Sequence, residues 1–150
     1  MAKMNKAIYF DMDGTIANLY AVDGWLPMLR NSDSTPYKEA KPMVRMNVLA
    51  RKLNKLQKDG YTIGIISWLA KDGNNEYNEK VTNAKREWLN KHLKSVNWNE
   101  VHIVEYGTPK HNIVRYPNGI LFDDEDKNRN EWTGTAYDEK EILNVLKAIN

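Results

Sequence analysis

Two aspartates stand one residue apart in the segment Asp11, Met12, Asp13, Gly14 and Thr15, directly after a short apolar run. A carboxylate is a competent nucleophile toward phosphorus and forms an aspartyl phosphate when a cation neutralises the phosphoryl oxygens. A second carboxylate nearby can then move protons. An isolated Asp-x-Asp pair is also compatible with an acidic turn that caps a helix. This segment alone therefore leaves a catalytic and a structural interpretation open.

Polar residues also follow or flank the later apolar runs of the chain. In chain order they are Ser67, Lys110, Asp123 and Asp124. Ser67 and the acidic pair each end an apolar run, whereas Lys110 closes the loop at residues 107–110. A lone serine or lysine in such a place is more often a strand-end hydroxyl or a solvated surface cation than a functional group. It is their order behind Asp11 and Asp13 that favours a shared site.

In this order and context, the four segments resemble the motifs of the haloacid dehalogenase superfamily over residues 7–124. The resemblance implies an α/β fold, a Rossmann-like three-layer sandwich with a central parallel sheet, and a Mg²⁺-dependent phosphohydrolase. The dehalogenase branch lacks the second acid and the ion-pumping branch has a threonine there. Asp13 therefore favours the phosphatase and phosphotransferase branch.

The resemblance also implies a role for each position. Asp11 is the expected nucleophile, Asp13 the general acid and base, and Lys110 a cation that holds the transferring oxygens. The expected Mg²⁺ ligands are Asp11, the backbone carbonyl of Asp13 and a carboxylate of the acidic pair, with Asp124 as first choice and Asp123 nearby. The expected phosphate contacts come from Ser67, its neighbour Trp68, Lys110, and the backbone N–H groups of the turn at Gly14 and Thr15.

Hydrophobic periodicity supports the same fold. Short apolar runs at residues 6–11, 61–67, 101–104 and 120–122 predict strands. Amphipathic patterns between or after them predict helices at residues 42–59, 81–93 and 142–149, the last behind a capping box of Asp138 and Glu141. Strands separated by helices indicate parallel pairing.

The segment at about residues 17–41 has no clean period and is predicted to be a small cap inserted after the first strand. Its aromatic residues Tyr20, Trp25 and Tyr37 would either stack against a nucleobase or simply pack the cap onto the core. A small cap predicts an open site. Together with the acidic pair, it is most similar to small nucleotidase-like members of the superfamily, including 5′(3′)-deoxyribonucleotidases.

Composition narrows the remaining choices. The chain of 150 residues fits one domain, with 41% hydrophobic and 28% charged residues. It has no cysteine, which excludes thiolate chemistry and Cys-ligated metals, and its polar start predicts neither a signal peptide nor a membrane anchor. We expect a cytoplasmic protein. The net charge of +2 makes nucleic acid an improbable partner, and the sequence does not predict an oligomeric state.

The predicted function is hydrolysis of a small phosphate monoester, with a nucleoside monophosphate as the preferred substrate. Two alternatives stay open: a phosphatase acting on polynucleotide ends, and a non-catalytic phosphate-binding regulator of the same fold. A pure binder has no need for a proton-transfer acid such as Asp13, which speaks against the regulator.

Overall fold

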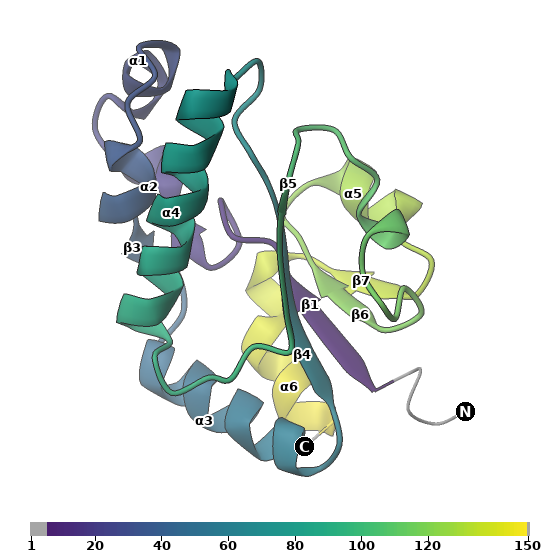
Figure 1. The fold of residues 1–150 in the computed structure, drawn as a ribbon. Coiled ribbons are helices and arrows are strands. Elements are labelled where there is room, and N and C mark those ends of the chain that lie inside the picture. Colours follow the sequence, from purple (N-terminus) through teal and green to yellow (C-terminus); the bar gives the residue numbers. More distant parts are fainter. Residues whose placement is uncertain (1–5, 150) are drawn as a thin grey trace.

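The computed structural model describes residues 6–149, and its core is a five-stranded parallel sheet (Figure 1). The strands are β1 (Ala7–Phe10), β4 (Thr62–Trp68), β5 (Glu100–Val104), β6 (Ile120–Phe122) and β7 (Thr135–Tyr137). They stand in the order β5-β4-β1-β6-β7, and all neighbours are parallel. The predicted parallel sheet is confirmed. The expectation about leaders and anchors rested on the polar residues at the N-terminus. Apart from Lys6, these residues lie outside the described part of the chain.

Three helices cover one face of the sheet: α3 (Met46–Lys58), α4 (Asn75–His92) and α6 (Ile142–Ile149). Figure 1 shows them on the side opposite to α5. The apolar stripe of α3 is fully buried at Leu49, Leu53 and Leu56, where it packs in one cluster with Ile8 and Phe10 of β1. The predicted three- and four-residue spacing therefore does place these leucines on the sheet.

The other face has a thinner cover, formed by α5 (Asp126–Glu131), the short 3₁₀ helix η3 (Lys110–Asn112) and the loops around them. Trp132, just after α5, packs edge-on against Tyr9 of β1 with ring centroids 5.8 Å apart. Its indole N–H donates to the carbonyl of Gly119 at 2.9 Å. Together the two covered faces make the three layers of the predicted sandwich.

Residues 17–42 form a segment that we call the insertion. The strands β2 (Ala17–Asn18) and β3 (Lys41–Pro42) pair antiparallel at its base. Between them lie the 3₁₀ helix η2 (Leu19–Ala21) and two short helices, α1 (Trp25–Arg30) and α2 (Thr35–Glu39).

The insertion is attached to α4, beside which it lies in Figure 1. Tyr77 of α4 donates its hydroxyl hydrogen to the carbonyl of Asp33 at 3.0 Å, and Trp88 donates its indole hydrogen to the carbonyl of Ala40 at 2.7 Å. Tyr37 of α2 is buried against the same helix, whereas α1 has no buried residue. The α2 half is therefore fixed to the core, whereas the α1 half is only partly covered.

Several local details differ from the expectation. The helix expected from residue 81 begins at Asn75, because the side chain of Asn74 caps it by accepting from the N–H of Tyr77 at 2.8 Å. The capping box is wrong: Asp138 accepts from the N–H of Lys140 at 2.9 Å, and a 3₁₀ turn, η4 (Glu139–Glu141), precedes α6. The elements β7 and α5 were not expected at all.

Among residues 6–149, no helix combines the length and the apolar character that a membrane crossing requires.

Candidate active site

Three predicted site residues meet at the carboxyl edge of the sheet. Asp11 follows β1, Ser67 lies near the end of β4, and Asp123 follows β6. Because β4 and β6 are the two parallel neighbours of β1, these ends must lie side by side. The sheet order therefore explains why residues far apart in the sequence form one cluster.

The turn after β1 depends on Gly14, whose φ of 81° lies in the left-handed region. A Cβ there would also meet the Asp124 carboxylate, 2.8 Å from its Cγ, and the ring of Tyr20 at 2.9 Å. Glycine is therefore needed both for the turn and for the close approach of the acidic pair.

The turn also corrects one expectation. The N–H of Gly14 donates to the carbonyl of Ala17 at 2.9 Å, and the N–H of Thr15 donates to that of Met12 at 3.1 Å. Neither group is free to bind phosphate as predicted. Among the described residues, no hydrogen-bond partner is found for the N–H groups of Met12 and Asp13, so these are the turn's free donors.

The side chain of Thr15 instead joins the two acidic segments. Its hydroxyl lies 3.2 Å from Oδ2 of Asp11 and 3.3 Å from Oδ1 of Asp124, and it accepts from the N–H of Asp124 at 3.1 Å. Thr15 is thus a bridge within the site.

Lys110 places a buried ammonium group between two carboxylates. Its Nζ lies 3.1 Å from Oδ1 of Asp11 and 2.6 Å from Oδ2 of Asp123. Burial lowers the pKa of Lys110, but the two carboxylates outweigh burial and hold the pKa above its ordinary value. Lys110 is therefore a fixed positive charge beside Asp11.

Several hydrogen-bond donors fix the position of Asp123. Besides Lys110, its side chain accepts from the amide of Asn128 at 3.1 Å and from the N–H of Glu125 at 3.0 Å. The guanidinium of Arg129 donates to its backbone carbonyl at 2.9 Å. With these donors in place, Asp123 has less capacity left for a further ligand than Asp124.

Asp11, Asp123 and Asp124 each offer a carboxylate oxygen within 4.8 Å of the others. Burial and the charge of Asp11 raise the pKa of Asp123 to about 6 and that of Asp124 to about 8. Such shifts mark a site where negative charges repel one another, and a bound cation would relieve that repulsion. All the donors are oxygens, as Mg²⁺ prefers, so these residues fit the expected metal.

The side chain of Asp13 points away from this cluster and pairs with Lys85 of α4. Lys85 Nζ lies 2.9 Å from Oδ2 of Asp13, 2.7 Å from Oγ of Ser67 and 2.6 Å from the carbonyl of Trp68. Burial raises the pKa of Asp13, and the positive charge of Lys85 opposes that rise. Ser67 is fully buried beneath the site, so it reaches Lys85 rather than the cavity surface.

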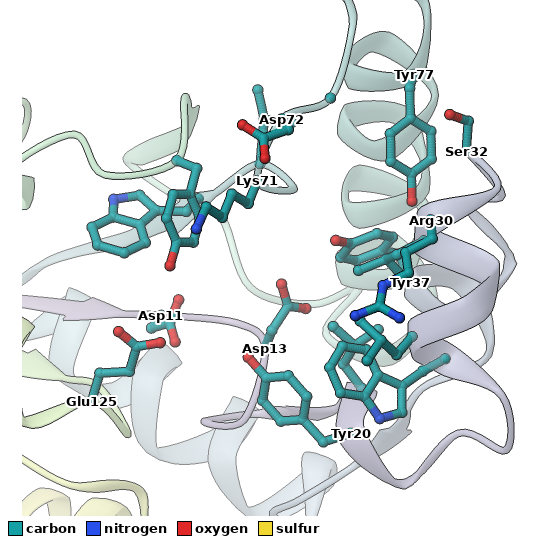
Figure 2. Close-up of a pocket in the computed structure, with 18 of the residues that line it drawn as sticks. Asp11, Asp13, Tyr20, Arg30, Ser32, Tyr37, Lys71, Asp72, Tyr77 and Glu125 are labelled. Atoms are coloured by element: carbon teal, nitrogen blue, oxygen red, sulfur yellow. The ribbon is translucent and has the colours of Figure 1, made fainter.

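A cavity of about 620 Å³ opens above the site, with Asp11 and Asp13 at its floor (Figure 2) and with Lys110 among its lining residues. Two pairs of aromatic rings line it. Tyr20 and Trp25 of the insertion meet edge to face at 5.0 Å between centroids, and Trp68 and Tyr106 lie 5.0 Å apart on the core side.

Trp68 itself is committed to a neighbouring loop. Its indole N–H donates to the carbonyl of Thr108 at 2.8 Å, and the Nζ of Lys110 lies 5.3 Å from its ring centroid. Its indole hydrogen is therefore not available for the phosphate contact that the sequence suggested, and the ring instead forms a wall beside Lys110.

Sequence reasoning missed Lys85 and Asn128. Lys85 belongs to the buried stripe of α4, together with Val81, Ala84, Trp88 and Leu89. A charged residue at the three- and four-residue spacing of a core stripe was the signal that could have identified it. Asn128 carries no such signal, because it lies in a helix with an entirely polar sequence.

No family model and no curated protein sequence matches this chain. Among solved structures, it is similar to the crystal structure of D,D-heptose 1,7-bisphosphate phosphatase from Burkholderia thailandensis, with a TM-score of 0.50 and 12% identity. The match covers 83% of this chain and 70% of that one. At such low identity the similarity shows the shared fold, and the predicted α/β fold, a Rossmann-like three-layer sandwich with a central parallel sheet, is confirmed.

Proposed function

We propose that this protein is a Mg²⁺-dependent phosphomonoester hydrolase that uses Asp11 as a covalent nucleophile. The observation that carries the proposal is the position of Asp11. Its carboxylate lies at the floor of the cavity, 3.1 Å from the buried ammonium of Lys110, with Asp13 lining the same cavity. A phosphoryl group above Asp11 would meet a nucleophile, a fixed cation and a proton carrier together.

The reaction proceeds in two displacements. An Asp11 oxygen forms a bond to phosphorus while the bond to the leaving oxygen breaks, and Asp13 gives that oxygen a proton. Water then attacks the aspartyl phosphate, Asp13 takes a proton from it, and inorganic phosphate leaves Asp11 free. Lys110 has two carboxylate partners for its three N–H groups, so the third can donate to a phosphoryl oxygen.

The residues that would hold Mg²⁺ are Asp11, Asp124 and the backbone carbonyl of Asp13. Asp124 is preferred over Asp123, because Asp123 already accepts from Lys110, Asn128 and the N–H of Glu125. When bound, Mg²⁺ supplies positive charge that offsets the repulsion between the acidic cluster and the phosphate.

A nucleoside monophosphate is the substrate class that the cavity supports best. A phosphate on Asp11 would leave the rest of the ester between the Tyr20 and Trp25 pair and the Trp68 and Tyr106 pair. Flat aromatic walls favour a flat ring, and stacking of one base on an aromatic side chain is worth about 1 to 3 kcal/mol in single-strand binders. Tyr20 and Tyr106 are 47% and 51% exposed, so both can reach a ligand.

The test is a panel of nucleoside monophosphates, sugar phosphates and end-phosphorylated oligonucleotides, assayed for released phosphate with Mg²⁺ and with EDTA. We expect turnover of mononucleotides only with Mg²⁺. Activity confined to strand ends would favour the polynucleotide alternative, and binding of phosphate without turnover would favour the regulator.

The nucleophile is tested separately by Asp11→Asn, with Asp59→Asn at an exposed helix end as the matched control. We expect the first variant to fold and to lose all turnover, and the second to keep full activity. Mass spectrometry of the acid-quenched native protein should find the phosphoryl group on Asp11. Full activity of Asp11→Asn would refute covalent catalysis by this residue.

A further inference from the structure

Lys85 is a charged residue in a position that normally holds an apolar one. It is 1% exposed and lies among Val81, Ala84, Trp88 and Leu89 on the buried side of α4. Burying a lysine is costly unless its charge is paired and its hydrogens are bonded. A leucine or methionine would fill this place on the helix without that cost, so the ammonium group calls for an explanation beyond packing.

All three hydrogens of the Lys85 ammonium have an acceptor. These are Oδ2 of Asp13 at 2.9 Å, Oγ of Ser67 at 2.7 Å and the carbonyl of Trp68 at 2.6 Å. A lysine has three donors and no more. Lys85 therefore has nothing left to donate to a substrate, and it does not line the cavity. Whatever it does for the reaction, it does through its partners.

This separates Lys85 from Lys110. Lys110 lines the cavity and donates to two carboxylates, so one of its hydrogens can reach a phosphoryl oxygen. Lys85 lies beneath the residues that line the cavity. Of its three hydrogen-bond partners, Asp13 is the one with a proposed catalytic role. The ring of Tyr37, from the insertion, covers Lys85 at 5.1 Å from Nζ to the ring centroid and shields it from water.

The hydrogen bond from Lys85 gives the two carboxylate oxygens of Asp13 different surroundings. Oδ2 is bound to Lys85, while Oδ1 has no hydrogen-bond partner among residues 6–149. Asp13 lines the cavity, and Figure 2 shows its carboxylate directed into it. One oxygen is thus held by the protein and the other is presented to the substrate.

We propose that Lys85 is the positioning residue of the proton carrier: it holds Oδ2 of Asp13 so that Oδ1 faces the leaving oxygen and then the attacking water. The proposal rests on the proposed function. Lys85 gives and takes no proton itself. Asp13 gives its proton as the ester bond breaks and recovers one from water as the Asp11–phosphorus bond breaks.

The experiment compares Lys85→Met with Lys91→Met, the same substitution at an exposed site on the same helix. Each is assayed on a nucleoside monophosphate, whose alkoxide leaving group needs a proton, and on p-nitrophenyl phosphate, whose leaving group does not. Because correct proton transfer is worth about 10²- to 10⁴-fold, we expect Lys85→Met to slow the first displacement about 10²-fold on the nucleotide and less than about 10-fold on the aryl ester, measured by rapid mixing as the first release of nucleoside or nitrophenol. The substrate concentration that half-saturates the first displacement should change little for either ester, and Lys91→Met should behave like the native protein.

A second variant keeps the test decisive if Lys85→Met fails to fold. In Asp13→Asn combined with Lys85→Met, neither charge is left buried alone, so this double variant is expected to fold. If Lys85 acts through Asp13, the double variant should turn over the nucleotide within about 3-fold of Asp13→Asn alone, because effects on one shared function are not additive.

Equal losses in the first displacement on both esters, or a large further loss in the double variant, would show that Lys85 is structural and would overturn the proposal. No turnover of any ester by the native protein would instead overturn the proposed function itself. The two failures are therefore distinguishable.

Discussion

The substitution Asp13→Asn separates proton transfer from metal binding. The Asp13 side chain lies outside the cluster of Asp11, Asp123 and Asp124, and only its backbone carbonyl is assigned to Mg²⁺. Among residues 6–149, the hydrogen-bond partner of this side chain is Lys85, which can still donate to an asparagine oxygen. The variant should therefore keep the cavity and the metal affinity and lose the acid, with a lower folding stability because the buried ammonium of Lys85 loses its carboxylate partner.

The expected loss of rate is the contribution of general acid catalysis, which Asp13→Asn removes. General acid catalysis is typically worth about 10²- to 10⁴-fold, or about 3 to 5 kcal/mol at the transition state. An alkyl phosphate should slow by this factor, because its alkoxide would have to leave without a proton. p-Nitrophenol leaves as a stable anion, so the first displacement on its phosphate ester should be much less affected.

The second displacement still needs a base for the attacking water, so breakdown of the aspartyl phosphate should limit turnover in this variant. In rapid mixing with p-nitrophenyl phosphate we expect a burst of nitrophenol equal to the enzyme concentration, followed by a slow steady rate. Mg²⁺ titrations of the native protein and of the variant should agree. Equal losses on alkyl and aryl esters, with no burst and a weaker response to Mg²⁺, would refute the reasoning and make Asp13 structural.

Lys110→Met removes a buried ammonium and leaves two carboxylates face to face, so we expect the free energy of unfolding in urea to fall by about 3 to 5 kcal/mol; an unchanged midpoint would contradict this. In EDTA, the melting temperature should fall as the pH rises from about 4 to about 8. Burial raises the pKa of Asp123 to about 6 and that of Asp124 to about 8. The folded state therefore holds more protons than the unfolded state in that range, and its stability falls as those protons are lost. Mg²⁺ should reverse the trend, and a flat profile in EDTA would count against the acidic cluster. Gly14→Ala should weaken the activation by Mg²⁺ about 10- to 100-fold, because its Cβ would displace Asp124. The control is Gly60→Ala, which has a similar φ of 97° but no atom within 4 Å of the added Cβ, so it carries the backbone strain without the collision.

Much of the candidate site was predictable because the order of parallel strands brings its residues together. Once the runs ending at Asp11, Ser67 and Asp123 are read as parallel strands, their ends must share one edge of the sheet. The structure brings Asp11, Asp123 and Asp124 together in that way, and η3 places Lys110 beside them.

The remaining features depend on contacts that no local pattern encodes. The bond between Lys85 and Asp13 joins residues 72 positions apart, and the lysine lies in a helix rich in charge. The strand β7 has three residues and is recognisable only by its pairing with β6. The engagement of the Gly14 and Thr15 N–H groups is set by the exact path of the turn, which the residue types alone do not fix.

The attachment of the insertion to α4 assigns recognition and chemistry to different parts of the molecule. Tyr37, Asp33 and Ala40 tie its α2 half to the helix that also carries Lys85, whereas α1 buries no residue. Exchanging residues along α1 would reshape the outer wall of the cavity and leave Asp11 and Asp13 undisturbed. Under the proposed function, α1 is therefore the segment through which the range of esters can be changed with little effect on Asp11 and Asp13, and it is the segment to randomise in directed evolution.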